Sequence, residues 1–576
     1  MAKIYDITND NLILKELYEK KLKAGDFDGA LSVIRRMESA KIDKESIYFY
    51  FASTYFNAKI YYESINNWFK YLSVCADKKR VRAYNGLGAC FFCLGDTQKA
   101  GYYFNLQMAS KNKSALPYDE VLKDFYKEVT DVKKVYTLAY PYEKADFTNL
   151  LDKCVELTKA SKYEEALKEL EVIPKESKFY GQAVMQKAIC HFFLNDEEKA
   201  VDTALYAVEL EPKNATVICN AISILKAFNL TTLTKIYVEE LKKVVNDVCD
   251  DDAVKIIMIL ADVGDFEFAK KIADKYLLKN GYDVHVLYVL GIVEYNLKNF
   301  ERAKELLLKN YRLTQNVISK YYAKQCERAI EKQKANKRVK KLDFIYDVPD
   351  DEKYRIYEKL VNLATKKTKK FNEELKEICE YCFYTTSEKT AFLAIDLLFE
   401  IKSKESLEYL KQKLINASVY DTFKRAIISC FILDGFTGEL SVVLGGRFKK
   451  INLVNVDFYG DNAFVFKSAY AYLVSQTCTF VDDINKLKES ALEVYGSLLF
   501  SGNEQNVDDY KALSAVMFEC SKIIEDINKT ELASFFSTST KKVKKVRDLY
   551  LVAFNESEPL ISEDIKRAIE EIYDEE

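Results

Sequence analysis

The sequence has few of the residues that interrupt helices. Its 576 residues include only 17 glycines and 6 prolines. A protein built from short strands and tight turns normally needs more of both, so this shortage favours long helices. Histidine is also scarce. His191 and His285 are the only two, and neither is accompanied by a signal for the oriented partner that acid–base catalysis requires. Packing inside a helix is the simpler interpretation of His191.

Long apolar runs are missing as well. No stretch approaches about 18 uninterrupted apolar residues, so we expect no membrane-spanning helix. The amino-terminal residues contain no apolar core after a basic region, so they do not form a secretory signal. The 13 cysteines are scattered, mostly inside helical patterns, which suits a reducing compartment better than a disulfide framework. We therefore expect a cytoplasmic protein.

An excess of positive charge is missing too. There are 86 lysines and arginines against 89 aspartates and glutamates, which gives a net charge of −3. A protein that binds nucleic acid through general attraction to phosphates is normally more basic. Hydrophobic residues make up 49% of the chain, and this excludes a largely disordered protein. The length exceeds what one hydrophobic core usually supports, so we expect several domains or an elongated array.

What the sequence does contain is a regular repeat. Small residues, each opening a helix-like stretch after a turn, recur at successive spacings of 34, 36, 66, 34, 34, 35 and 34 residues. The spacing of 66 is close to two periods, so a diverged pair is expected at about 112–145. A period this regular predicts a solenoid of helical hairpins. These marker residues are Ala30, Ser64, Ala100, Ala166, Ala200, Thr234, Ala269 and Ala303.

The repeat has an internal pattern of large, small and aromatic residues before a turn. One copy reads Tyr84, Leu87, Gly88, Phe91, the turn Gly95-Asp96 and the marker Ala100. This pattern resembles the tetratricopeptide repeat, over residues 10–312. One copy, at about 215–247, lacks the Gly-Asp turn and is degenerate. The resemblance implies an all-α superhelix of hairpins, whose concave groove binds a segment of another protein.

The pattern changes after the repeats. Residues 316–341 read as one long charged helix that caps the solenoid, and a proline between acidic residues follows it. We therefore expect a repeat domain at 1–342 and a second helical domain at 343–576. The second domain has amphipathic stretches with a weak resemblance to HEAT-type helical pairs. Its β signal is Gly445-Gly446 between two strand-like runs, which predicts a hairpin near 439–456.

The resemblance also implies which residues line the groove. In tetratricopeptide repeats particular positions of each first helix face the concave side, and these positions are carried over here residue by residue. The resulting set is apolar and aromatic with a few hydrogen-bonding groups, as in surfaces that bind a peptide or a helix. Alternatively, some of these side chains fill gaps between repeats or contact the chain's own C-terminal half. The set comprises Phe49, Tyr50, Phe56, Arg82, Asn85, Phe92, Met185, Gln186, Ile189, Phe192, Phe193, His285, Tyr288, Ile292, Tyr295 and Asn296.

Signals for catalysis or metal binding are weak. Two Cys-x-x-Cys pairs occur, Cys90/Cys93 and Cys379/Cys382, but they lie far apart and in different expected domains. Cys190 takes the place of Cys90 in its own repeat, which favours a small packing residue at that position. No phosphate-binding glycine loop, dinucleotide fingerprint, zinc-protease motif or nucleophile elbow occurs. We expect no catalytic residue, no metal and no cofactor.

Three lysine-rich clusters support an alternative function. They lie at 332–341, 366–370 and 541–547. If folding brought them onto one face, they would form a patch for nucleic acid or another anionic surface. The simpler interpretation is that they are solvated helix ends, since aromatic residues for base stacking are missing inside the clusters. Our first hypothesis is therefore a non-enzymatic scaffold or adaptor. A nucleic-acid-associated protein is the second, and a C-terminal domain with its own activity is the third.

Overall fold

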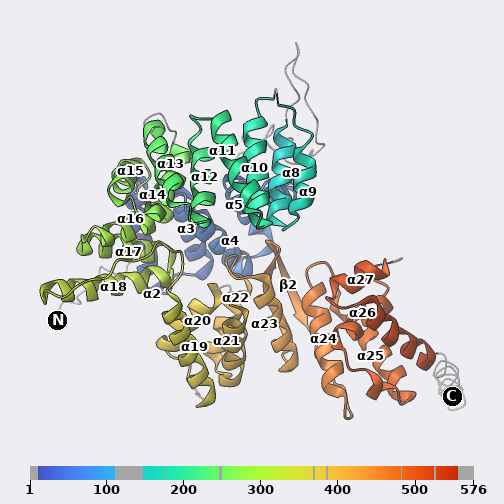
Figure 1. The fold of residues 1–576 in the computed structure, drawn as a ribbon. Helices are drawn as coiled ribbons and strands as arrows, with labels where there is room; N and C mark the ends of the chain where they lie inside the picture. The colour runs from blue at the N-terminus through green and yellow to red at the C-terminus, as the bar shows by residue number, and fades with distance from the viewer. Residues whose placement is uncertain are drawn as a thin grey trace, which may run out of the picture.

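The computed structural model describes residues 11–109, 147–175, 177–245, 250–366, 370–384, 387–481, 483–524 and 527–554. Within these ranges the regular structure is helical, apart from one two-stranded antiparallel hairpin (Figure 1). The predicted all-α class with a single hairpin is therefore confirmed. The diverged pair expected at about 112–145 lies outside the described residues.

The first part of the chain is a series of antiparallel helical hairpins, coloured blue to yellow-green in Figure 1. From α1 to α6, and again from α8 to α18, neighbouring hairpins stack side by side, as the sequence repeat predicts. The helices are α1 Asn11–Lys23, α2 Phe27–Ser39, α3 Lys44–Asn57, α4 Tyr61–Val74, α5 Arg80–Cys93, α6 Thr97–Ala109, α8 Thr148–Lys159, α9 Tyr163–Leu170, α10 Tyr180–Phe193, α11 Glu197–Leu210, α12 Ala215–Ala227, α13 Thr231–Val244, α14 Asp250–Val263, α15 Phe266–Lys279, α16 Val284–Asn296, α17 Phe300–Thr314 and α18 Val317–Lys334.

The turn inside each hairpin contains one residue with a left-handed backbone. It stands five positions before the marker residue, with φ between 58° and 86°. Glycine adopts this conformation freely, whereas other residues cost about 1–2 kcal/mol there. The degenerate repeat keeps the same turn, because Asn229 takes the place of glycine. The residues are Gly25, Lys59, Gly95, Ser161, Asn195, Asn229, Gly264 and Lys298.

The solenoid curves until its first repeat touches its last. The Tyr282 ring, just before α16, lies 5.1 Å from the Phe27 ring of α2, and its hydroxyl accepts a hydrogen bond from the Phe27 N–H. Arg35 donates to the carbonyl oxygen of Arg312 at 2.6 Å, and the Arg312 guanidinium lies near Asp28. Figure 1 shows α2 next to α17. The first hairpin therefore packs against the last repeat, in a hydrophobic cluster that includes Leu14, Leu287 and Leu313.

The capping helix is shorter than predicted. Helix α18 ends at Lys334, whereas the sequence pattern predicted a helix over 316–341. Asn336 has a φ of 52°, which ends the helix in the left-handed region. Residues 335–349, here called the connecting segment, then run without helix or strand to α19.

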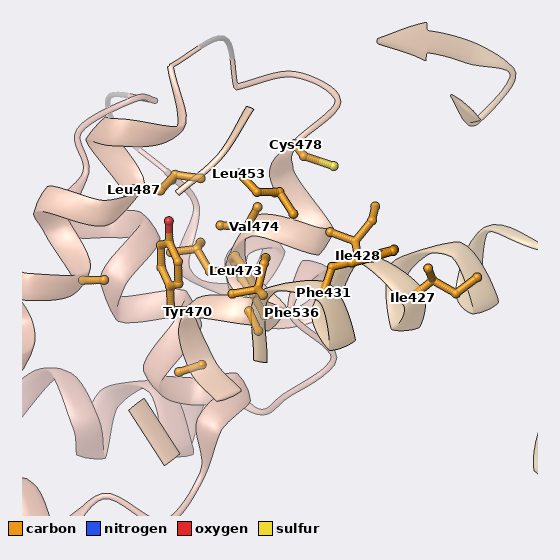
Figure 2. Close-up of a cluster of buried hydrophobic side chains, with 14 of the residues drawn as sticks. Ile427, Ile428, Phe431, Leu453, Tyr470, Leu473, Val474, Cys478, Leu487 and Phe536 are labelled. Atoms are coloured by element: carbon orange, nitrogen blue, oxygen red, sulfur yellow. The ribbon is translucent and has the colours of Figure 1, made fainter. Parts of the chain in front are cut away.

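The second half of the chain has one continuous core, which runs from α19 to the last described helix, residues 540–554. Figure 2 shows part of it, where α23, β2, α24 and α25 contribute side chains such as Phe431, Leu453 and Tyr470. The helices are α19 Asp350–Thr365, α20 Glu373–Tyr384, α21 Glu388–Ile401, α22 Lys404–Leu414, α23 Asp421–Leu433, α24 Ala463–Thr477, α25 Ile484–Phe500, α26 Tyr510–Cys520 and α27 Lys529–Phe535.

The predicted hairpin is present and joins the two halves. Strands β1 (Gly438–Leu444) and β2 (Arg447–Leu453) pair in register from Gly438 opposite Leu453 to Leu444 opposite Arg447. Its tip lies against α6, where the buried Tyr103 hydroxyl donates to the Gly446 carbonyl at 2.6 Å and accepts from the Phe448 N–H at 3.2 Å. A single side chain of the third repeat thus satisfies two backbone groups of the hairpin.

We predict that Tyr103→Phe loosens this junction. The substitution keeps the ring and removes the hydroxyl, which leaves two backbone groups without a partner at a cost of roughly 1–3 kcal/mol. Amide hydrogen exchange at Phe448 should accelerate accordingly. Tyr102→Phe is the matched control, because the ring of Tyr102, rather than its hydroxyl, lies against the Arg447 guanidinium at 5.0 Å. Equal exchange at Phe448 in both variants would show that the hydroxyl contributes nothing.

The hairpin is also fixed from within the second half by a buried lysine. Lys424 of α23 is 1% exposed, and its ammonium donates to the Val443 carbonyl at 2.8 Å. Burial lowers the pKa of Lys424 from its ordinary value of 10.5 to about 8, and the Asp421 carboxylate, 3.6 Å away, limits the fall. The folded chain therefore releases this proton near pH 8, whereas the unfolded chain keeps it up to about pH 10.5.

This difference predicts a pH dependence. Since the protonated form is disfavoured in the folded chain, stability should be lower below pH 8 and should rise as the pH increases from about 8 to 10.5. The full change is on the order of 3 kcal/mol at about 1.4 kcal/mol per pH unit. Denaturant unfolding of the wild type and of Lys424→Met across this range measures it, because the variant lacks the titrating group. A constant difference between the two proteins would contradict the assignment.

Candidate functional site

The expected groove residues fall into three sectors, on α3 and α5, on α10, and on α16. The α16 sector is largely covered by the chain itself. Tyr288, Ile292, Tyr295 and Asn296 are all buried, whereas His285 is exposed. The covering element for Tyr288 and Asn296 is the connecting segment, which returns from the end of α18 along the inner side of α16. The sequence pattern placed a helix over its first part and therefore did not indicate this contact.

Side chains of α16 bind the main chain of the connecting segment. Asn296 donates from Nδ2 to the Leu342 carbonyl and accepts from the Leu342 N–H at Oδ1, both at 2.8 Å. About two turns before Asn296, the Tyr288 hydroxyl donates to the Ile345 carbonyl at 2.6 Å. The segment therefore runs antiparallel to α16, and its backbone polar groups are satisfied by side chains instead of by a helix or sheet.

Apolar side chains of the same segment complete the contact. The Tyr346 ring stacks on the Tyr288 ring with centroids 5.3 Å apart, and its edge faces His285 at 6.4 Å. Leu342 and Phe344 pack against the cluster that joins α16, α17 and α18. At the far end, the Tyr322 hydroxyl of α18 donates to the Asp347 carbonyl at 2.9 Å. The α16–α18 face therefore binds an extended peptide that belongs to the chain.

The other buried residues of this sector pack between helices. Ile292 is fully buried, and Tyr295 lies edge-on to the Phe300 ring of α17 at 5.0 Å. Burial raises the pKa of Tyr295 to about 12, so its hydroxyl stays protonated. Met185, from the α10 sector, is likewise in the core at 3% exposure. These three side chains support the wall of the inner face from behind.

The sector on α3 and α5 is aromatic and partly open. Phe49 lies 5.8 Å from the Trp68 ring, with the Arg82 guanidinium above it at 5.9 Å. Tyr50 packs against Tyr18 and Phe56 against Tyr61, and all three groove aromatics are half-buried. Arg82 and Phe92 are exposed, and Asn85 is intermediate. This sector combines aromatic surface with a guanidinium and a side-chain amide.

The α10 sector is similar in character. Gln186 donates to the Thr158 hydroxyl of α8 at 2.9 Å, and Ile189 is half-buried beside it. Phe192 packs edge-on to Phe228 at 5.5 Å. Phe193 stacks on Tyr163 at 5.2 Å and remains 52% exposed. It stands seven residues before its marker Ala200, as Asn296 does before Ala303, so the two occupy the same position of the repeat.

Between these sectors lies a polar strip that sequence reasoning missed. Side chains of α12 pair with side chains of α14 about one repeat later in the chain. The pairs are Thr216 with Asp252 at 2.6 Å, Asn220 with Lys255 at 2.6 Å, and Lys226 with Asp262. Partial burial lowers the pKa of Lys255. The sequence did contain a signal for this strip. Polar residues of the degenerate repeat at about 215–247 are followed, about one repeat length later, by polar residues that can pair with them.

Most of the described cysteines are placed as packing residues, whereas Cys93 is exposed. Cys90 is buried and donates to the Ser64 hydroxyl at 3.3 Å, and burial raises its pKa to about 12. Burial raises the pKa of Cys382 to about 12 as well, so both thiols stay protonated and unreactive. Over the described ranges, no three or more His, Cys, Asp or Glu side chains are grouped to hold a metal ion.

The lysine clusters do not gather on one face. The cluster at 541–547 lies in the C-terminal bundle, at the opposite side of Figure 1 from α18, where the first cluster begins. Part of it is neutralised, since Lys542 pairs with Asp509 at 2.9 Å and Arg547 with Glu519 at 2.7 Å. Residues 367–369 of the second cluster are outside the described part. None of the helices that the structure describes combines the length and apolarity needed to cross a membrane.

The geometry defines the class of protein: the first part of the chain is a tetratricopeptide-like solenoid, followed by a helical half that packs on it. No family model and no curated protein matches the chain. Among solved structures it is similar to YrrB, a TPR protein with an unusual peptide-binding site, at 16% identity and a TM-score of 0.25, over 31% of this chain and 92% of that one.

Two further solved structures are similar over more of the chain. Yeast Tom70 shares 10% identity with a TM-score of 0.20, over 96% of this chain and 98% of that one. A human IFIT1 dimer with PPP-AAAA shares 13% identity with a TM-score of 0.24, over 72% of this chain and 91% of that one. Identities this low leave the function to be argued from the chain's own geometry.

The connecting segment gives a direct test of the site. Asn296→Leu keeps the branched shape of the side chain and removes both hydrogen bonds to Leu342, so residues 337–348 should detach more often. Losing about 1.4 kcal/mol would raise the detached fraction roughly tenfold. Limited trypsin digestion after Lys340 and Lys341 measures this. The control is Glu305→Leu, an exposed position on the outer helix α17. Equal cleavage in both variants would contradict the role of Asn296.

Proposed function

We propose that the chain is a non-enzymatic scaffold or adaptor that binds an extended segment of a partner protein along the inner face of its solenoid. The pairing of Asn296 with both backbone groups of Leu342 supports this most. A side-chain amide that satisfies the N–H and the C=O of one residue binds an extended backbone whatever its side chain is. The inner face therefore has the chemistry of a peptide-binding surface.

The two remaining sectors extend this surface beyond the connecting segment. Phe92 and Phe193 are 45% and 52% exposed, which leaves ring area for a partner side chain. Aromatic residues of this kind are typical anchors of protein interfaces, and arginine is another, as at Arg82. The polar strip of α12 and α14 lies between the α10 and α16 sectors and supplies hydrogen-bonding groups. A partner segment is thus expected to contact several repeats.

A nucleic-acid-associated function has less support. Its physical basis was a shared basic patch, and the C-terminal cluster is both distant from α18 and partly paired with acids. We also propose a reducing compartment such as the cytoplasm, because the cysteines of the described ranges are free and mostly buried thiols.

We expect the double variant Phe92→Ala with Phe193→Ala to lose its partner. Both side chains are about half exposed, so folding should be little affected, whereas removing two aromatic anchors should weaken binding roughly tenfold or more. Affinity capture from native cell extract, followed by mass spectrometry, measures this. The matched control is Tyr62→Ala with Leu278→Ala, which removes two exposed apolar side chains from the outer helices α4 and α15. A partner that both variants retain equally is not bound by the inner face.

A further inference from the structure

The connecting segment is attached to the α16–α18 face in the manner of a bound peptide. Three side chains, Tyr288, Asn296 and Tyr322, make four hydrogen bonds to its main chain, at Leu342, Ile345 and Asp347. Main-chain contacts of this kind do not depend on the sequence of the segment. A different extended chain can make all four of them. The side-chain requirement is limited to the apolar contacts.

Three of the apolar side chains, Leu342, Phe344 and Tyr346, stand two residues apart and contact the repeats. Leu342 and Phe344 are half-buried, Asp343 between them is exposed, and Tyr346 keeps 44% of its surface exposed while its ring stacks on Tyr288. Ile345 adds a further apolar contact. Burial raises the pKa of Tyr346 to about 12, so the stacked ring is neutral. The face therefore fits a short extended segment with a leucine and two aromatic residues at alternate positions.

From this we infer that the α16–α18 face is a docking surface for an extended partner segment with this leucine–aromatic–aromatic alternation, and that residues 337–348 are its resident competitor. The inference rests on the proposed function and names both the partner's chemistry and how access is controlled. Residues 337–341 contribute little to the competition, because four of the five are exposed. The competitor is fixed at its other end, where the Asp347 carboxylate accepts from the Tyr381 hydroxyl at 3.0 Å and pairs with Lys353 at 3.1 Å.

The advantage of the resident segment is its covalent connection. A segment on a short connection has an effective concentration on the order of millimolar. A partner with the same contacts must reach that concentration to displace it, whereas a partner that also binds the α10 sector displaces it at a lower one. The face is therefore closed to weak ligands and open to ligands that contact more than one sector.

The test uses the whole chain and a fluorescent peptide with the sequence of residues 337–348. We expect the wild type to bind it with an apparent Kd in the millimolar range. Phe344→Ala with Tyr346→Ala weakens the resident segment, and this variant should bind the peptide at least tenfold more tightly by fluorescence anisotropy. Adding Asn296→Leu to that variant should abolish the gain. A control peptide carrying Leu342→Ser, Phe344→Ser and Tyr346→Ser should not bind.

A variant that melts like the wild type and binds no peptide overturns the inference, as does equal affinity in wild type and variant. If the variant does not fold, hydrogen exchange of the wild type decides. Millimolar peptide should accelerate exchange of the Leu342 amide, and unchanged exchange overturns the inference. If the peptide experiment fails but the Phe92/Phe193 double variant still loses its partner, only the docking face on α16–α18 is contradicted. If the peptide binds as expected but the double variant keeps its partner, the wider binding surface of the proposed function is contradicted instead.

Discussion

The structure depends on one packing constraint, which is that the two helices of a hairpin approach each other at a residue with little or no side chain. A Cβ atom on Gly88 would lie 2.4 Å from the Phe104 ring, and one on Gly291 would lie 2.7 Å from Leu307. Such distances are impossible between real atoms, so both positions require glycine or a local shift. The marker residues are buried for the same reason. Because this geometry recurs about every 34 residues, small rotations between hairpins accumulate into a regular curve.

That curve produces the interior in which binding is proposed. By the eighth marker the solenoid has returned to its first repeat, where Tyr282 meets Phe27. Helices from distant parts of the sequence then pack in one cluster, which joins Leu14 of α1 to Leu287 of α16. An extended segment that does not pair with a strand must have its main-chain polar groups satisfied by side chains. Asn296 and Tyr288 do this for the connecting segment. Helix α18 stacks beside α17 and α16, and side chains of α16 and α18 together bind the connecting segment.

The repeat could be predicted because its signal is local. Each marker residue, each turn and the Gly445-Gly446 pair lies within a few residues of the helix, turn or hairpin that it specifies. The course of the connecting segment could not be predicted, because its contacts join Leu342 to Asn296 and Ile345 to Tyr288 across many residues. In addition, its lysines continue the charge pattern of α18, so the sequence predicted a longer helix there. The expected groove positions were drawn from the resemblance alone, so they did not separate Ile292, which packs in the core, from Asn296, which binds a backbone.

The two halves are joined in a way that does not require the connecting segment. At the interface the Ala417 N–H donates to Asn66 of α4 at 2.7 Å, beside the hairpin contact with Tyr103. Nearby, the buried Lys413 ammonium pairs with Glu380 at 2.6 Å, in a setting where removing one partner would leave an unpaired buried charge. On the solenoid side, Asn66 lies on α4 and Tyr103 on α6, and neither belongs to the α16–α18 face. If a partner displaces the segment, as proposed, these contacts between the halves would stay in place.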